Sequence, residues 1–206
     1  MSVVIPVVSL GTKYVLDAVA LDRVRETLRA GGLVVHPTDT VYGLAADPFQ
    51  DAAVGRVYAA KARPRNLALS MAVPEVSDVF RYGTKTPLAE NFCAKNLPGP
   101  YTVVLKATPE APKALVSQAG LIGLRVPDHP IPRLLAKACG PIISTSANRH
   151  GQPSPTTCDE AQAQLGEAVD VYLDAGPTPL GQESTVVDLS GPRAKILRRG
   201  AVPKGA

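Results

Sequence analysis

Residues 33–43 read Leu-Val-Val-His-Pro-Thr-Asp-Thr-Val-Tyr-Gly, an apolar run followed directly by small polar side chains. A short apolar run bounded by turn residues predicts a buried strand. On its N-terminal side, Leu21, Val24 and Leu28 recur at helical spacing, and Gly31-Gly32 ends that pattern. The stretch therefore predicts an amphipathic helix that leads into a strand, which is the basic unit of an α/β fold.

The rest of the chain continues this alternation. Asp51 is expected to cap a helix that ends at Pro64, and Thr86 with Pro87 to begin another that runs to Leu97. Further helices are predicted over 131–139 and 159–165, and strands over 3–10, 101–107, 121–126, 141–145, 169–173, 185–189 and 195–198. This interleaving predicts a mixed α/β sheet with helices packed on it. Since no repeat or linker marks a boundary, we expect a single domain over residues 1–206.

Composition limits the classes of partner. The 206 residues are 45% hydrophobic and 19% charged, which suits one sizeable core. A formal net charge of +4 favours anionic partners such as a nucleotide or RNA. A basic surface that serves only solubility is the alternative interpretation.

The cysteines and histidines are scattered along the chain. The odd number of cysteines and the lack of a C-x-x-C pair indicate neither a disulfide framework nor a zinc site, and imply a reducing compartment. The separated histidines suggest no metal site. The apolar segment 3–10 is interrupted by Pro6 and is interpreted as a strand rather than a signal peptide, and no segment is long enough to cross a membrane. The cysteines are Cys93, Cys139 and Cys158, and the histidines are His36, His129 and His150.

Familiar phosphate-binding loops do not account for an anion site. Residues 176–181 have the glycine spacing of a P-loop, but Gln182 and Glu183 follow where a lysine and a hydroxyl residue are needed. An acidic residue at that place would repel phosphate. No G-x-G-x-x-G follows a strand, and no serine lies in a G-x-S-x-G turn. Any anion site must therefore be built from other segments.

Polar side chains follow the predicted 33–35 strand. In an extended chain, residues two apart share a face, so Thr38, Thr40 and Tyr42 are expected to form a wall of hydroxyl groups. The alternative is an ordinary strand, because these residue types are good strand formers.

Two further segments carry groups suited to an anion. Lys61 and Arg63 would point apart on a continuing helix, but Pro64 is expected to make Arg63 extended and bring both charges to one polyphosphate. A solvated basic helix end is the alternative. Ser146 and Asn148 share a face at a predicted strand end and would suit ribose or phosphate oxygens.

Taken together and in order, these segments resemble the YrdC/TsaC family of threonylcarbamoyl-AMP synthases over residues 21–201. The matching motifs are P-T-D-T-V-Y-G-L at 37–44, K-x-R-P at 61–64, L-P-G-P-Y-T at 97–102, G-L-R-V-P-D-H-P at 123–130, S-T-S-A-N at 144–148 and E-S-T-V-V-D at 183–188. The resemblance implies an α/β domain with a wide twisted sheet and a large basic central cavity. It also implies a reaction of L-threonine, bicarbonate and ATP that gives threonylcarbamoyl-AMP and pyrophosphate for the modification of tRNA.

The resemblance also implies roles for individual residues. ATP contacts fall on Lys61, Arg63, Ser146, Asn148, Ser154 and Arg198, with Lys61 and Arg63 as the catalytic pair. Threonine contacts fall on Thr40, Arg125, Ser144 and Ser184, where Arg125 is the natural bidentate partner for the carboxylate. No metal ligand from the protein is expected, and Mg²⁺ is expected to be bound through the phosphates.

One loop departs from the family pattern. The family reads R-P-x-x-x-P-L, whereas this chain has Arg65-Asn66-Leu67-Ala68 after Pro64 and lacks the second proline. Leu67 therefore stands where a polar contact is expected. The chain otherwise resembles the short form of the family, without an additional C-terminal domain, and a cytoplasmic location is expected.

The alternative functions belong to different classes. One is a double-stranded RNA or tRNA-binding module without catalysis, which the positive net charge favours. The other is a carbamoyl-adenylating domain of the hydrogenase-maturation type, whose companion domains and zinc-finger cysteines this sequence does not contain. As partners, the synthase interpretation implies the small-molecule substrates and the threonylcarbamoyl-transferase machinery, with direct contact to tRNA left open.

Overall fold

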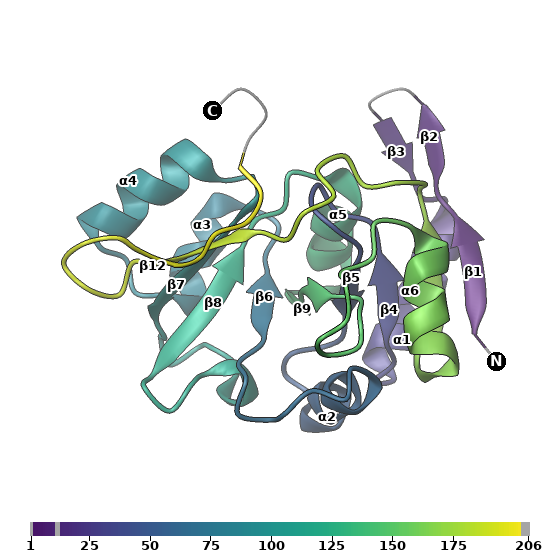
Figure 1. Ribbon diagram of the computed structural model, residues 1–206, viewed down its shortest axis with the longest axis horizontal. Coiled ribbons are helices and arrows are strands. Elements are labelled where there is room, and N and C mark those ends of the chain that lie inside the picture. Colours follow the sequence, from purple (N-terminus) through teal and green to yellow (C-terminus); the bar gives the residue numbers. More distant parts are fainter. Residues whose placement is uncertain (1, 11–12, 203–206) are drawn as a thin grey trace.

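The computed structural model describes residues 2–10 and 13–202, and these form six α-helices, two mixed β-sheets and a hairpin (Figure 1). The helices are α1 Ala18–Arg29, α2 Asp51–Ala60, α3 Val76–Tyr82, α4 Pro87–Asn96, α5 Pro130–Cys139 and α6 Cys158–Leu165. The hairpin pairs β2 Val8–Leu10 with β3 Lys13–Val15. In the part of the chain that the structure describes, none of the helices has the length and apolar character needed to cross a membrane.

The first sheet has five strands. Their order is β1 Val3–Pro6, β11 Val171–Asp174, β4 Val34–His36, β5 Gly43–Ala45 and β10 Thr145–Ser146. The first three run parallel, whereas β5 and β10 are antiparallel to their neighbours. Because side chains alternate along a strand, Val34 packs with α1 and α5, and Val35 joins the cluster that contains α6. Helices therefore cover both faces of this sheet.

The second sheet has six strands. Their order is β13 Lys195–Arg198, β12 Thr185–Asp188, β7 Tyr101–Lys106, β8 Leu121–Arg125, β6 Ser70–Ala72 and β9 Ile142–Ile143. Parallel pairs of β12 with β7 and of β8 with β6 alternate with antiparallel pairs. Two 3₁₀ turns, Lys113–Leu115 and Gly166–Ala168, complete the regular elements of the described residues.

The two sheets meet at Ser144. Strand β9 ends the six-stranded sheet and β10 ends the five-stranded one, and only Ser144 separates them in the sequence. The Ser144 N–H donates to the Ser70 carbonyl at 2.9 Å, and the Ile143 N–H donates to the Ala46 carbonyl at 2.9 Å. This crossing places residues 144–148 where the two sheets meet.

Local signals account for several helix boundaries. The Asp17 side chain accepts from the Ala20 N–H at 2.7 Å at the start of α1, and Val24 and Leu28 are buried as predicted. Thr86 caps α4 through the Ala89 N–H at 3.1 Å, with Pro87 at the first helical position. The predicted helical spacing of Val24 and Leu28 and the predicted cap at Thr86 are confirmed, whereas the cap at Asp17 was not predicted.

The α/β class is confirmed, but the predicted strands are divided differently. The strand expected over 3–10 is divided into β1, which pairs with β11, and β2, which pairs with β3 in the hairpin. The strand expected over 141–145 is likewise broken at Ser144. The strands consequently form two mixed sheets rather than one wide sheet.

The predicted ends of α2 are wrong. Gln50 occupies the cap position, and Asp51 is the first helical residue. The helix ends at Ala60, before Pro64, because Ala62 adopts a left-handed conformation with φ 47°. The Ala62 N–H bonds the Ala59 carbonyl at 3.0 Å and the Arg63 N–H bonds the Tyr58 carbonyl at 2.9 Å, which is the Schellman pattern of a helix C-terminus.

Candidate active site

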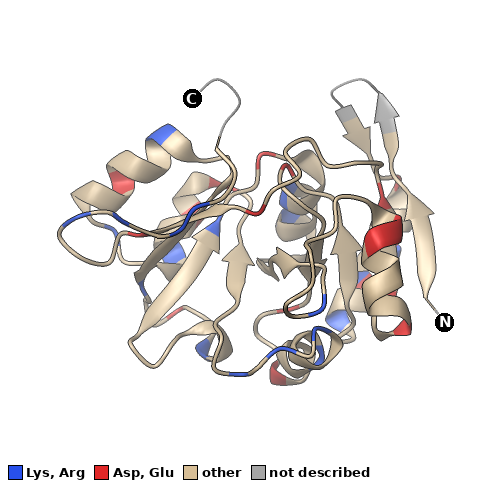
Figure 2. Cartoon of the chain, viewed as in Figure 1, with Lys and Arg blue, Asp and Glu red and all other residues tan. Residues whose placement is uncertain are grey.

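A cavity of about 580 Å³ lies where the two sheets meet, and residues of both sheets line it. Nine of the ten sequence-predicted site residues line this cavity: Thr40, Lys61, Arg63, Arg125, Ser144, Ser146, Asn148, Ser184 and Arg198. Four of them are cationic, and they come from the segment after α2, from β8 and from β13. Figure 2 shows Lys and Arg on the segment after α2 and on the C-terminal segment that includes β13. The tenth residue, Ser154, bonds to the lining residue Glu183.

Lys61 reaches the cavity from the end of α2 and is only 1% exposed. Its ammonium donates to the Ser146 carbonyl, to the Asn148 carbonyl at 2.7 Å and to Asn148 Oδ1 at 3.1 Å. These bonds use all three ammonium protons. Burial, followed by the charge of Arg63, lowers the pKa of Lys61 to about 7, while Glu183 opposes that shift. Lys61 thus fixes the segment 146–148 as well as bringing a charge to the cavity.

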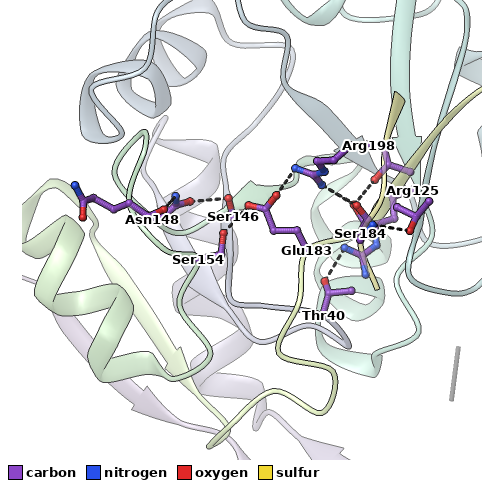
Figure 3. Close-up of polar contacts among 12 residues, drawn as sticks. Thr40, Arg125, Ser146, Asn148, Ser154, Glu183, Ser184 and Arg198 are labelled. Carbon is purple, nitrogen blue, oxygen red and sulfur yellow. Dashed lines mark hydrogen bonds and ion pairs between the residues drawn. The ribbon is translucent and has the colours of Figure 1, made fainter. Parts of the chain in front are cut away.

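Asn148 ties the same segment together through its side chain. Its Oδ1 accepts from Ser146 Oγ at 2.6 Å in addition to Lys61. Its Nδ2 donates to the Gln152 carbonyl at 2.6 Å and to the Arg149 carbonyl at 3.0 Å. The predicted pairing of Ser146 with Asn148 is therefore present, and Figure 3 shows the two side chains joined.

Arg63 follows the left-handed residue Ala62, and its charge is close enough to Lys61 to lower the pKa of that ammonium. Its Nε donates to the Leu67 carbonyl at 3.3 Å, and its Nη2 donates to the Ala68 carbonyl at 3.1 Å. The loop that departs from the family pattern therefore holds Arg63 through backbone oxygens. Ala68 lines the cavity, whereas Leu67 does not belong to the lining.

Glu183 bonds two of the predicted site residues, and no role was predicted for it from the sequence. Its Oε1 accepts from Ser154 Oγ at 2.5 Å, and its Oε2 accepts from Arg198 Nη1. Arg198 also donates through Nη2 to the Ser184 carbonyl at 2.8 Å. Burial raises the pKa of Glu183, but the Ser154 hydrogen bond and the Arg198 charge outweigh it and hold the pKa below its usual value. Figure 3 shows Glu183 between Ser146 and Ser154 on one side and Arg198 on the other.

Arg125 lines a buried part of the cavity. It is the last residue of β8 and is 6% exposed. Its Nη2 donates to Asp39 Oδ1 at 2.6 Å and its Nη1 donates to Thr40 Oγ1 at 2.9 Å. With one contact of Nε to the Gly99 carbonyl at 3.4 Å, two of its five N–H groups remain for a ligand. Nearby, the hydroxyls of Thr102 and Ser184 bond each other at 2.9 Å.

The predicted wall of three hydroxyls is only partly correct. Residues 37–42 form a bend rather than a strand, in which Thr38 Oγ1 accepts from the Thr40 N–H at 3.0 Å and lies 2.9 Å from Thr40 Oγ1. Tyr42 also lines the cavity, but its hydroxyl points elsewhere and donates to the Gly176 carbonyl at 2.8 Å. Thr40 bonds Arg125, and Thr38 bonds Thr40 in turn.

Sequence reasoning missed the two carboxylates that balance the arginines. Asp39 and Glu183 both lie inside motifs that were singled out, each directly beside a predicted threonine contact, Thr40 and Ser184. A signal existed, because buried or partly buried cations require a counter-charge. The site can bind a large anion through several cationic side chains. Next to these cations lies a smaller group of hydroxyls together with Arg125.

The order of these segments is shared with known proteins. The sequence profile of the Sua5/YciO/YrdC family, which carries the description "Telomere recombination", matches residues 26–200. The chain belongs to this family. The resemblance drawn from the motifs is thereby confirmed.

Relatives of known name and structure agree with this membership. The threonylcarbamoyl-AMP synthase of Bos taurus is 39% identical over 181 residues, which are 84% of this chain and 65% of that protein. The crystal structure of Pyrococcus abyssi Sua5 complexed with L-threonine superposes with a TM-score of 0.90 at 30% identity, covering 98% of this chain and 58% of that one. Escherichia coli YciO superposes with a TM-score of 0.86 at 27% identity, covering 100% of this chain and 98% of that one. The chain thus spans about six-tenths of the length of Sua5 and nearly all of YciO.

Proposed function

We propose that this protein is a threonylcarbamoyl-AMP synthase, which converts L-threonine, bicarbonate and ATP into threonylcarbamoyl-AMP and pyrophosphate for the modification of tRNA. The observation that carries the proposal is the convergence of Lys61, Arg63, Arg125 and Arg198 on one cavity. Its volume of about 580 Å³ lies within the range of roughly 300–1,000 Å³ that is usual for ligand pockets. The name of the bovine relative and the threonine in the Sua5 complex support the same reaction.

The nucleotide role belongs to the end of the cavity around Lys61. Ser146, Asn148 and Ser154 supply hydroxyl and amide groups there, and Lys61, Arg63 and Arg198 supply positive charge. An oxygen of N-carboxythreonine attacks the α-phosphorus, a new P–O bond forms, and the bond to the β-phosphate oxygen breaks to release pyrophosphate. Charge spreads over the phosphate oxygens in the transition state, so fixed cations and positioning are the main catalytic contributions.

The threonine role belongs to the end around Arg125. Its two remaining N–H groups can receive a carboxylate, and Asp39 fixes the plane of the guanidinium. The hydroxyls of Thr40, Ser144 and Ser184 lie in the same lining and can bind the amino acid. Burial of this end also keeps water from the unstable N-carboxythreonine.

Magnesium is proposed to enter with the nucleotide. The described residues contain no group of three or more Asp, Glu, His or Cys side chains placed to hold a metal ion. Mg²⁺ accepts phosphate oxygens, water and one or two carboxylates, and one carboxylate, Glu183, lines the cavity. When bound, Mg²⁺ would neutralise charge on the phosphates.

The reaction can be tested with labelled bicarbonate, ATP and L-threonine. We expect pyrophosphate release that requires all three, and a loss of at least about 100-fold in kcat/KM for Arg198→Ala, which removes a positive charge from the developing transition state. Arg81→Ala is the matched control, because Arg81 pairs with Glu110 on the surface. Equal pyrophosphate release without threonine would contradict the proposal.

The remaining partners stay predictions. The +4 net charge supports contact with tRNA or double-stranded RNA, and the product requires a transferase that consumes it. If the protein is an RNA-binding module without catalysis, RNA binding should depend on salt, and tRNA modification should stay normal after Lys61→Ala or Arg63→Ala. If it is the synthase, either variant should lose tRNA modification. A cytoplasmic location and a single domain over residues 1–206 also stay predictions.

A further inference from the structure

Glu183 holds donors that a nucleotide would use. Its two oxygens accept from Ser154 and Arg198, and both residues are proposed ATP contacts. A carboxylate and a phosphate accept the same charge-assisted hydrogen bonds. An incoming triphosphate therefore has to take these donors from Glu183 or share them with it.

The carboxylate of Glu183 carries the same sign of charge as a nucleotide phosphate. Among the lining residues in the described part of the chain, Glu183 is the one Asp or Glu. Lys61, Arg63 and Arg198 line the same cavity as Glu183, and Arg198 bonds it directly. Once a phosphate binds Arg198, the Glu183 carboxylate lies next to a second anion and must share Arg198 with it.

From this geometry we infer that Glu183 is a specificity-determining residue, which selects the magnesium complex of the nucleotide over the metal-free nucleotide. The inference rests on the proposed function. Glu183 yields Ser154 and Arg198 to the phosphates and becomes an oxygen ligand, directly or through water, of the cation that the phosphates carry. A single protein carboxylate together with phosphate oxygens and waters is the coordination that Mg²⁺ commonly accepts.

The pair it forms is suited to such an exchange. The side chains of Arg198 and Glu183 are 47% and 31% exposed, so neither is locked in a dry core. Arg198 lies on β13, whose four residues are all exposed. Movement of this pair therefore disturbs little packing.

The test measures ATP binding by calorimetry with excess EDTA and with excess Mg²⁺, in the absence of threonine and bicarbonate. For the wild type we expect Mg²⁺ to tighten ATP binding. For Glu183→Gln we expect metal-free ATP to bind about tenfold more tightly than to the wild type, because the competing anion is gone, and the gain from Mg²⁺ to disappear. Glu110→Gln, which removes the same charge from a surface arginine pair, should behave as the wild type.

A second readout needs no variant. With Mn²⁺ in place of Mg²⁺, water proton relaxation reports how many waters remain on the ion. Direct ligation by Glu183 gives fewer waters in the protein complex of Mn²⁺–ATP than in free Mn²⁺–ATP, and Glu183→Gln restores one. Ligation through water leaves their number unchanged but slows their exchange, and Glu183→Gln removes that slowing.

The outcomes separate the inference from the proposed function. If the wild type binds ATP neither with nor without Mg²⁺, the proposed function fails and the inference fails with it. If the wild type binds ATP but Glu183→Gln keeps the same ratio of the two affinities, the role of Glu183 is wrong and the synthase remains. If Glu183→Gln does not fold, the relaxation measurement on the wild type decides. In that case, the inference is overturned if the number of Mn²⁺ waters and their exchange rate are both the same in the protein complex as in free Mn²⁺–ATP.

Discussion

Two arginine–carboxylate pairs face the same cavity and differ in burial. The Arg125 and Asp39 side chains are 8% and 7% exposed and lie 2.6 Å apart. The Arg198 and Glu183 side chains are 47% and 31% exposed. A buried pair is costly to break because the remaining charge has no solvent, whereas a half-exposed pair contributes little to stability. The cavity therefore has one fixed end and one end that can exchange partners.

The strands that carry the two arginines differ in the same way. Arg125 ends β8, which lies between β7 and β6 in the six-stranded sheet. Arg198 ends β13, which is the edge strand of that sheet. A central strand fixes the direction of a side chain on both sides, and an edge strand leaves one side free. Arg125 is therefore the more constrained of the two arginines.

The largest expected effect comes from breaking the buried pair. Asp39→Ala leaves the Arg125 guanidinium buried without its counter-charge, and we expect the free energy of unfolding to fall by about 3–5 kcal/mol. Denaturant unfolding followed by circular dichroism measures it. Glu110→Ala breaks a surface pair with Arg81 and should cost less than about 1 kcal/mol. Equal losses in the two variants would remove the distinction between the ends.

The second-largest expected effect is a loss of folding stability at low pH, caused by two buried histidines. His36 and His129 are 0% and 5% exposed, and burial lowers the pKa of each to about 4. Since their unfolded pKa is about 6.5, the unfolded chain takes up protons first as the pH falls. Each histidine should lower the free energy of unfolding by roughly 3 kcal/mol between pH 6.5 and pH 4, and this contribution does not grow below pH 4.

Substitution isolates this contribution from that of the carboxylates. His129 accepts from the Ile131 N–H at the start of α5, so His129→Asn keeps a capping acceptor but cannot titrate. The difference in unfolding free energy between pH 7 and pH 4.5 should shrink in this variant. His150→Asn, at an exposed histidine, is the matched control. An unchanged difference in His129→Asn would show that His129 is not a source of the acid sensitivity.

At the exchangeable end, a backbone substitution should stabilise the protein. Ala62 has φ 47°, where a Cβ costs about 1 kcal/mol relative to glycine. Ala62→Gly should therefore raise the free energy of unfolding by about 1 kcal/mol, less the entropy that glycine adds to the unfolded chain. Ala59→Gly, on the exposed face of the same helix, should lower it by roughly 0.5–1 kcal/mol. A loss of stability in both variants would mean that the left-handed residue is not strained.

The sequence predicted what is local. Helix caps at Thr86 and the helical spacing of Leu21, Val24 and Leu28 depend on near neighbours, and they are present in the structure. The division into two sheets depends on pairings between distant strands, and the three-residue strands β5 and β6 carry too few residues to show a period. Helix α3 and both of these strands were accordingly not predicted.

The site was predicted as far as single segments carry it. Motif order brought Lys61, Arg63 and Arg198 into one set, and they do line one cavity. The counter-charges were missed because their partners are remote: Asp39 bonds Arg125 across 86 positions. The hydrogen bonds within the cavity could not be predicted from the sequence either. They show that Lys61 binds the backbone of residues 146 and 148.

The smallest expected effect is on the stability of the Glu183→Gln variant. Glutamine can still bond Ser154 and Arg198, and the pair is half exposed, so the free energy of unfolding should change by less than about 1 kcal/mol. The same substitution is expected to alter ATP binding about tenfold, which corresponds to about 1.4 kcal/mol. A residue that serves folding would show the reverse order. Paired measurement of unfolding and ATP affinity on one preparation therefore decides whether Glu183 belongs to the architecture or to the exchange of ligands, and a loss of several kcal/mol on unfolding would assign it to the architecture.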